Sequence, residues 1–369
     1  MRPVVDLVAG ARPNFMKLAP VVRAVTEQGA LAFRIVHTGQ HYDEAMNQVF
    51  FDELDIPAPD VHLEVGSGSH GAQTARILER YEAHLLEDRP DASVVFGDVN
   101  STVACSLAAV KLGVPVAHVE AGLRSFDRSM PEEINRLLTD AVSDLLLVSE
   151  ASGLANLRHE GVAAEKARLV GNVMIDTLLS RLDAARAQGT AARLGLPERG
   201  YGLVTLHRPS NVDDPATLRR LVTLLHELAE RLPLVFPVHP RTQNAAATAG
   251  FGELLSPGGR QGLVCLGPQA YLDTLSLAAG ARVVLTDSGG LQEESSVLRV
   301  PCLTLRENTE RPITVELGTS RLVGNDVDRI RVAFRQALDG DWPAGQEIPL
   351  WDGQAGVRVA RELAAWLNA

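Results

Sequence analysis

Short apolar runs alternate with helical patterns along almost the whole chain, and this alternation limits the possible folds more than any other feature. In the first half, apolar runs occupy Val4–Ala9, Arg34–Thr38, Val94–Phe96, Val114–Val119 and Leu145–Val148, and helical patterns cover Met16–Glu27, Ala72–Glu87, Ser101–Leu112 and Glu132–Ala141. Runs this short and apolar are typical of strands that are buried on both faces. Strands that alternate with helices predict βαβ units and a mostly parallel sheet.

The same pattern restarts after Gly200, beyond a polar stretch rich in Ala and Arg that begins near Gly171. Strands are predicted at Gly202–Leu206, Leu234–Pro237, Leu263–Leu266, Val283–Leu285 and Cys302–Leu305, and a last helix at Gln354–Leu367. A chain of 369 residues is long for a single core. We therefore predict an α/β protein of two doubly wound domains, residues 1–171 and 172–352, followed by a terminal helix in 353–369.

Composition excludes several classes of partner. The chain has 35 Lys and Arg against 46 Asp and Glu, a net charge of −11, which argues against broad binding to nucleic acid or membrane surfaces. No uninterrupted apolar segment approaches the ~20 residues of a membrane span, and the first apolar run is typical of a strand rather than a signal peptide. The three cysteines lack metal-ligand spacing, which predicts no metal site and indicates reduced thiols in a cytoplasmic protein.

Polar residues gather directly after the predicted strands, where doubly wound sheets bind their ligands. They are Arg12, Lys17, Asp98, Glu120, Glu132 and Arg136 in the first half, and His207, Arg208 and His239 in the second half. Taken singly, each has an ordinary explanation, such as a solvated arginine, a structural histidine or an acid that complements a helix dipole. Their shared position after strands favours a site at the facing edges of the two domains.

The segment LTDSGGLQEES, from Leu285 to Ser295, carries the clearest chemical signal. Ser288 is placed to cap a helix, and Gly289 and Gly290 leave the amides of its first turn accessible to a phosphate. Glu294, more than a turn further on, is able to accept hydrogen bonds from sugar hydroxyls. This combination favours a nucleotide diphosphate, although an ordinary strand-to-helix turn with dipole-complementing acids fits the same residues.

A second glycine-rich segment suggests a different ligand. GSGSHG, from Gly66 to Gly71, fits the G-x-G-x-x-G pattern of dinucleotide-binding folds, follows VHLEV and precedes a helical stretch. However, Val61–Val65 alternates like an edge strand, and a complete strand–helix–strand unit already precedes it. A dehydrogenase is therefore the minor alternative.

Taken together, several segments closely resemble the non-hydrolysing UDP-N-acetylglucosamine 2-epimerases. They are GARPNFMK, TGQH, GDVNST, HVEAGLRS, MPEEINR, GN, LHRPSN, PVHP, TDSGGLQEE and TERPITVELGT, in family order from Arg12 to Gly318. The resemblance implies a GT-B fold with two Rossmann-like domains, an active-site cleft between them, and a terminal helix that packs back on the first domain. It also implies a cytoplasmic homodimer that dimerises through the first domain, with no metal and no cofactor such as nicotinamide.

The same resemblance implies the reaction and the roles of the residues. UDP-GlcNAc and UDP-ManNAc interconvert by elimination of UDP to 2-acetamidoglucal and re-addition. This reaction supplies ManNAc-derived units for bacterial surface polysaccharides. Asp98, Glu120 and Glu132 match the family's catalytic acids, and His207 matches its functionally important histidine. The substrate-binding residues are Arg12, Lys17, Arg136 and His239 around the diphosphate and sugar, Ser288, Gly289 and Gly290 at the leaving UDP, and Glu294 at the ribose.

Some positions depart from the family pattern and keep alternatives open. Asn14-Phe15 stand where the better-known bacterial members have Glu-Ala. Gln40, Arg208 and His239 match the second, activating substrate site of many members, but Asp43 replaces a glutamine there. The GSGSHG loop occupies the region of a further activator-site arginine. These departures argue against activation by substrate and leave room for an epimerase of a related UDP-diacetamido sugar. A hydrolysing relative, a retaining GT-B glycosyltransferase and a non-catalytic nucleotide-sugar sensor share parts of the pattern.

Overall fold

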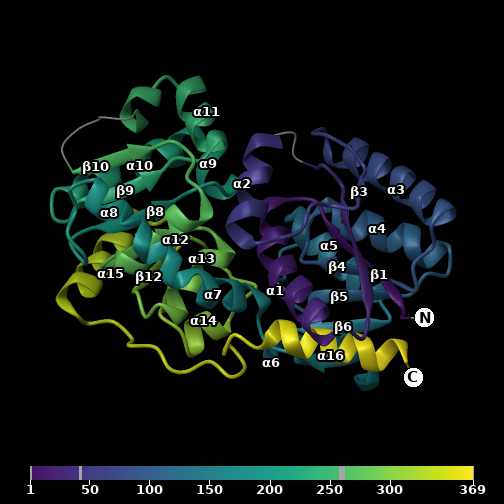
Figure 1. The fold of residues 1–369 in the computed structure, drawn as a ribbon. Coiled ribbons are helices and arrows are strands. Elements are labelled where there is room, and N and C mark those ends of the chain that lie inside the picture. The colour runs from purple at the N-terminus through teal and green to yellow at the C-terminus, as the bar shows by residue number, and fades with distance from the viewer. Residues whose placement is uncertain (1, 41–43, 257–261, 369) are drawn as a thin grey trace. The chain divides into compact units, whose positions relative to one another are not determined.

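Two compact α/β units make up the chain (Figure 1). The computed structural model describes residues 2–40, 44–256 and 262–368, with only the backbone described for Arg12 and residues 44–48. Residue contacts divide the chain into Met1–Ser180 with Pro349–Ala369, which we call unit 1, and Arg181–Ile348, which we call unit 2. The boundary lies at residue 180, inside a helix, rather than at the expected residue 171, and the return to unit 1 begins at residue 349 rather than 353.

Unit 1 is a parallel sheet covered by helices, and seven of its strands lie in the described part of the chain. The strands are β1 (Val4–Ala9), β2 (Ala32–His37), β3 (Val61–His62), β4 (Ala92–Phe96), β5 (Val116–Ala121), β6 (Leu145–Val148) and β7 (Ala167–Leu169). The helices are α1 (Arg12–Gln28), α2 (Glu44–Leu54), α3 (His70–Glu87), α4 (Asn100–Lys111), α5 (Pro131–Val142), α6 (Ala151–His159), the short η1 (Ala164–Lys166), and α16 (Ala355–Leu367). Helix α7 (Val173–Gln188) crosses the boundary between the units.

Unit 2 repeats the same design. Its strands are β8 (Gly202–Thr205), β9 (Leu234–Pro237), β10 (Leu263–Leu266), β11 (Val283–Thr286), β12 (Cys302–Thr304) and β13 (Ser320–Leu322). Its helices are α8 (Thr190–Arg193), α9 (Pro209–Val212), α10 (Pro215–Ala229), α11 (Pro240–Thr248), η2 (Gly252–Leu255), α12 (Tyr271–Gly280), α13 (Gly289–Val297), α14 (Ile313–Glu316) and α15 (Val327–Asp339). The central strands are almost fully buried, because helices cover both faces of the sheet.

The strand orders show where ligands are expected to bind. The sheet of unit 1 runs β3-β2-β1-β4-β5-β6-β7 and that of unit 2 runs β10-β9-β8-β11-β12-β13, with all described pairings parallel. In both sheets the order reverses next to the first strand, between β1 and β4 and between β8 and β11. The carboxyl ends of strands at such a switch point form the usual ligand crevice of doubly wound folds. This confirms the predicted fold class of two Rossmann-like units.

The terminal helix α16 packs against α1 within unit 1, as its label and yellow colour in Figure 1 show. A Cβ on Gly356 would lie 2.6 Å from the carbonyl oxygen of Pro20, so only glycine permits this close approach. Asp176 on α7 accepts hydrogen bonds from the amides of Ala355 and Gly356 and thereby caps the start of α16. In the part of the chain that the structure describes, no helix is both long and apolar enough to cross a membrane.

Candidate active site

At the switch point of unit 1, Lys17 and Glu120 form a buried ion pair. Lys17 lies on α1, directly after β1, and Glu120 lies near the carboxyl end of β5. The Lys17 Nζ is 2.7 Å from Glu120 Oε2, and the two side chains are only 6% and 4% exposed. A Cβ on Gly97, after β4, would lie 2.5 Å from the same Nζ, so the ammonium group sits against the turn that precedes Asp98. Three strand ends thus meet around one positive charge.

The backbone at Glu120 is strained. Its φ is 76°, in the left-handed region that residues other than glycine rarely adopt. The pairing of β5 with β6 shifts register between Val119 and Ala121, so Glu120 is the extra residue of a β-bulge. Bulges re-aim side chains, and strain of about 1–3 kcal/mol is typically found at functional sites. Here the bulge takes Glu120 out of the regular alternation of β5 and places it beside Lys17.

Asp98 is held by a second set of buried charges. Arg136 Nη1 bonds Asp98 Oδ2, while Arg136 Nε and Nη2 bond Glu133 Oε2 at 3.2 and 2.9 Å. Glu133 also accepts from the amide and hydroxyl of Ser125 and from the amide of Phe126. Burial by itself would raise the pKa of Glu133, but these hydrogen bonds and the arginine lower it overall. Glu133 therefore orders both the loop after β5 and, through Arg136, the carboxylate of Asp98.

The remaining predicted residues of unit 1 are less constrained. Glu132 is the second residue of α5, which Pro131 opens as predicted, and its side chain is half-buried. Arg12 is the first residue of α1, and its side chain lies outside the described part of the structure.

The residues that depart from the family pattern serve internal packing. Asn14 Oδ1 accepts from the amides of Gly10 and Ala11, and its Nδ2 donates to the carbonyl of Phe96. Phe15 packs in a buried aromatic cluster, 5.5 Å from the ring of His37 and 4.9 Å from that of Phe51.

The predicted activator-site residues of unit 1 are only partly described. Gln40 Oε1 accepts from the amide and hydroxyl of Ser101, so this side chain has an internal role. Asp43 lies outside the described residues.

The turn at Ser288 opens a helix of unit 2, as the sequence predicted. Gly289 and Gly290 open α13, and Ser288 occupies the N-cap position without a capping hydrogen bond from its side chain. A Cβ on Gly289 would lie 2.7 Å from Arg311 Nη1, so a guanidinium group lies against the first turn of this helix. Arg311 is 5% exposed and pairs with Glu293 at 2.7 Å and with Glu310 at 2.6 Å. Helix amides and an arginine at one point form a favourable anion site.

Glu294 is a buried residue of the same helix. It is 5% exposed, and the hydroxyl of Tyr271 donates to its Oε1 at 3.2 Å. Burial raises the pKa of Glu294 to about 7; the Tyr271 bond lowers it and the charge of Glu293 raises it. Glu294 thus accepts from a hydroxyl group within the protein.

His207 and His239 lie side by side after β8 and β9, with ring centroids 5.5 Å apart. Asp287, after β11, is fully buried and accepts from the amides of His207 and Arg208 and from Asn211 Nδ2. His207 Nδ1 lies 3.1 Å from Asp287 Oδ1. Burial alone would raise the pKa of Asp287, but the contacts with His207 and the other donors lower it.

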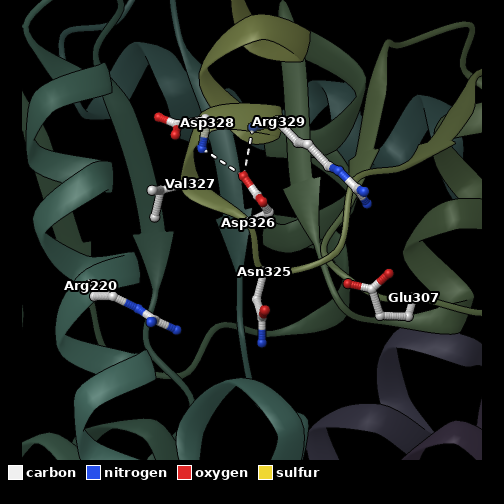
Figure 2. A pocket seen from close by; sticks show the side chains of 7 residues that line it. All are labelled: Arg220, Glu307, Asn325, Asp326, Val327, Asp328 and Arg329. Carbon is white, nitrogen blue, oxygen red and sulfur yellow. Dashed lines mark hydrogen bonds between the residues drawn. The ribbon is translucent and has the colours of Figure 1, made fainter.

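A separate surface cavity of unit 2 does not coincide with these residues. It has a volume of about 460 Å³ and lies at the start of α15, lined by Arg220, Glu307, Asn325, Asp326, Val327, Asp328 and Arg329 (Figure 2). Asp326 accepts from the amides of Asp328 and Arg329, so its own side chain already caps this helix. None of the predicted site residues lines the cavity.

Within the described ranges, no three or more His, Cys, Asp or Glu residues are grouped in a way that could hold a metal.

Comparison with known proteins decides the family. The family model described as UDP-N-acetylglucosamine 2-epimerase matches residues 23–364. The chain belongs to this family. It is 40% identical over 365 residues to the UDP-N-acetylglucosamine 2-epimerase of Methanocaldococcus jannaschii, which covers 97% of this chain and 98% of that protein. It is 41% identical over 367 residues to the UDP-2,3-diacetamido-2,3-dideoxy-D-glucuronate 2-epimerase of Pseudomonas aeruginosa, with 97% and 98% covered.

Solved structures of UDP-N-acetylglucosamine 2-epimerases share the whole fold. The M. jannaschii enzyme in complex with UDP-GlcNAc and UDP matches with a TM-score of 0.91 at 40% identity, covering 98% of this chain and 99% of that one. The Neisseria meningitidis enzyme bound to UDP-GlcNAc matches with a TM-score of 0.90 at 28% identity, covering 98% and 100%. The chain is therefore an epimerase, an enzyme of the isomerase class, with the two Rossmann-like units of GT-B proteins. The dehydrogenase alternative was wrong: GSGSHG follows β3, a strand of two residues at the sheet edge.

Three residues near the candidate site of this UDP-N-acetylglucosamine 2-epimerase family member were not predicted from the sequence: Asp287, Arg311 and Glu133. Asp287 was visible only as an acid that ends an apolar run, with nothing to show that it binds the turn after β8. Arg311 follows β12 by several residues and is not adjacent to Gly289 in the chain. Glu133 lies in the first turn of α5, where acids commonly complement the helix dipole, so its position alone does not show that its carboxylate bonds Arg136 and the loop after β5.

Proposed function

We propose that this epimerase interconverts UDP-GlcNAc and UDP-ManNAc by elimination and re-addition of UDP. The observation that supports this most directly is the meeting of Asp98, Glu120 and Lys17 at the switch point of unit 1. Glu120 is buried and Asp98 is partly exposed, and two carboxylates at this sheet edge suit a proton transfer that needs no metal or nicotinamide. Two relatives of 40% and 39% identity carry the name UDP-N-acetylglucosamine 2-epimerase.

Unit 2 supplies the binding of the leaving group in this proposal. UDP departs as an anion when the C1–O bond breaks, so its diphosphate needs donors that are already in place. The first-turn amides of α13 and the guanidinium of Arg311 provide them, with Ser288, Gly289 and Gly290 forming the turn. Glu294 accepts hydrogen bonds from the ribose hydroxyls, for which its buried carboxyl is positioned.

Unit 1 supplies the proton transfers. The C2 proton of the sugar is only weakly acidic, and positive charge that develops at C1 during loss of UDP makes it easier to remove. Loss of the C2 proton and of UDP leaves 2-acetamidoglucal. A proton must then return to the opposite face of C2 before UDP adds back to C1. One fixed base cannot easily serve both faces, so Asp98 and Glu132 transfer the protons and Glu120 orients or shares them. Lys17 and Arg136 hold two of these carboxylates in place.

Solvent labelling tests this proposal. The enzyme is incubated with UDP-GlcNAc in deuterated water, and the products are followed by ¹H and ³¹P NMR. We expect UDP-ManNAc with deuterium at C2 and no accumulation of UDP. Epimerised product without deuterium would refute proton exchange with solvent, and accumulating UDP would indicate a hydrolysing enzyme. Asp98→Asn should abolish exchange, whereas a glycosyltransferase would tolerate this change.

A second candidate substrate has specific support. The P. aeruginosa relative, 41% identical, is a UDP-2,3-diacetamido-2,3-dideoxy-D-glucuronate 2-epimerase. The same labelling experiment with that nucleotide sugar, alone and in competition with UDP-GlcNAc, gives the ratio of the two kcat/KM values. The larger value identifies the preferred substrate. We also propose that the chain forms a homodimer, which light scattering on the purified protein tests.

A further inference from the structure

The two histidines at the strand ends of unit 2 contact partners of opposite hydrogen-bonding character. His207 Nδ1 lies 3.1 Å from Asp287 Oδ1. An ionised carboxylate is only an acceptor, and Asp287 has a lowered pKa. The proton of the neutral His207 ring therefore lies on Nδ1, and its Nε2 carries a lone pair.

His239 has the reverse arrangement. Its Nδ1 accepts the backbone N–H of Arg241 at 3.2 Å, because His239 is the N-cap residue of α11. A nitrogen that accepts this bond carries no proton, so the neutral ring is protonated on Nε2. The ring centroids of His207 and His239 are only 5.5 Å apart, so two neighbouring rings carry their protons on different nitrogens.

We propose that Asp287 and the amide of Arg241 fix opposite tautomers in His207 and His239, so that the neutral pair offers one acceptor and one donor at its Nε2 atoms. The acceptor suits a sugar hydroxyl and the donor suits a phosphate oxygen, and a nucleotide sugar carries both groups. This assignment rests on the proposed function for the identity of the ligand, but not for the tautomers. It makes Asp287 a positioning residue that acts through His207.

The surroundings of Asp287 fix the effect of removing its charge. Three donors converge on Oδ2: the amides of His207 and Arg208 at 3.0 and 2.9 Å, and Asn211 Nδ2 at 3.1 Å. In Asp287→Asn the remaining carbonyl oxygen must face these donors, which puts the new NH₂ group opposite His207 Nδ1. That group donates a proton, so His207 Nδ1 must become the acceptor. The substitution should therefore move the ring proton of His207 to Nε2 and turn both histidines into donors.

The tautomers are measured by long-range ¹H–¹⁵N NMR of the full-length protein labelled with ¹⁵N-histidine, at a pH where both rings are neutral. Signals are assigned by their loss in His207→Asn and His239→Asn. We expect wild-type His207 protonated on Nδ1, His239 protonated on Nε2, and His207 switched to Nε2 in Asp287→Asn. Asp273→Asn, the same chemical change at a surface pair with Arg193, should alter neither ring. A wild-type His207 protonated on Nε2 overturns the proposal, and this spectrum decides even if Asp287→Asn does not fold.

Kinetics separate positioning from a purely structural role. Asp287→Asn should lower kcat at least 100-fold with a smaller effect on KM, yet it should cost less than about threefold in a His207→Asn background. If Asp287→Asn lowers kcat equally in wild type and in His207→Asn, Asp287 only stabilises the loop after β8, and its proposed role through His207 is wrong. A wild-type enzyme that turns over no UDP-sugar would refute the proposed function instead, while the NMR result would still decide the tautomers.

Discussion

Removing one partner of the Lys17–Glu120 pair should destabilise unit 1 strongly. Both side chains are at least 94% buried and the charges are 2.7 Å apart. Glu120→Gln keeps the shape of the side chain but leaves the ammonium of Lys17 without its counter-charge in the interior. Loss of one partner of a buried pair typically costs about 3–5 kcal/mol, mostly because the other charge remains desolvated. Lys17→Met should cost a similar amount by stranding the carboxylate of Glu120.

The double variant Lys17→Met/Glu120→Gln removes both charges and should be within about 1 kcal/mol of the wild type, because the desolvation penalty disappears with the pair. Urea unfolding followed by circular dichroism measures the three free energies, with the transition of unit 1 analysed separately if the two units unfold apart. The catalytic proposal adds a second readout. Incorporation of deuterium at C2 should stay at least 100-fold below wild type in the double variant, although its stability has returned.

Two outcomes would contradict this reasoning. If each single change costs less than about 1 kcal/mol and the two effects add, the pair does not contribute as a desolvated unit. If the double variant regains deuterium exchange together with stability, Glu120 is needed only for folding. Arg331→Gln, at an exposed ion pair with Glu227 in unit 2, is the matched control and should change stability by no more than about 1 kcal/mol.

Three further predictions follow from the geometry. Gly289→Ala should weaken UDP binding at least tenfold in calorimetry with little loss of stability, because the atoms nearest to its Cβ are the ends of the Arg311 and Glu310 side chains. Gly267→Ala, where a Cβ meets open space, should have no effect. Since Glu294 must be ionised to accept from both ribose hydroxyls, and burial raises its pKa to about 7, UDP affinity should fall below pH 7 in wild type more than in Glu294→Gln. Burial raises the pKa of Asp176 to about 6, above its unfolded value, so its stabilising contribution is complete below pH 3.8 and is lost as pH rises through 6. Between pH 4.5 and 7 the free energy of unfolding should therefore fall by about 2 kcal/mol more in wild type than in Asp176→Asn.

The sequence predicted several strands well, because buried strands consist mainly of apolar residue types. The runs at β1, β6, β9 and β10 were found with their observed bounds, since their side chains are mostly apolar, Asp6 of β1 being a buried exception. The edge strands β7 and β13 were missed, because Ala167–Leu169 and Ser320–Leu322 are short, partly exposed and interrupted by arginine. The boundary at residue 171 was placed by composition, whereas the division by contacts falls at residue 180, inside α7.

The site was predictable to the level of position but not of pairing. Asp98, Glu120, His207 and the Ser288 turn follow strands as expected, because the carboxyl ends of parallel strands gather at one edge of each sheet, and their roles in the reaction stay a prediction. The bulge that gives Glu120 a φ of 76° depends on how β5 pairs with β6, which local sequence does not encode. The tautomers of the two histidines depend on contacts that only the folded chain brings together.

The charges of unit 1 bear on which nucleotide sugar the enzyme prefers. Identities of 40% and 41% to epimerases of two different substrates do not separate them. At the ends of β1, β4 and β5 and the start of α5, the described side chains include two cations, Lys17 and Arg136, and four carboxylates: Asp98, Glu120, Glu132 and Glu133. Both cations are already paired with these acids. A uronate adds another carboxylate to the sugar, and an excess of negative charge opposes its binding. We therefore expect a higher kcat/KM for UDP-GlcNAc than for the uronate, and a ratio between the two that falls as salt screens the repulsion. A preference for the uronate at low salt would show that a cation outside this set, such as Arg12, determines binding of the sugar.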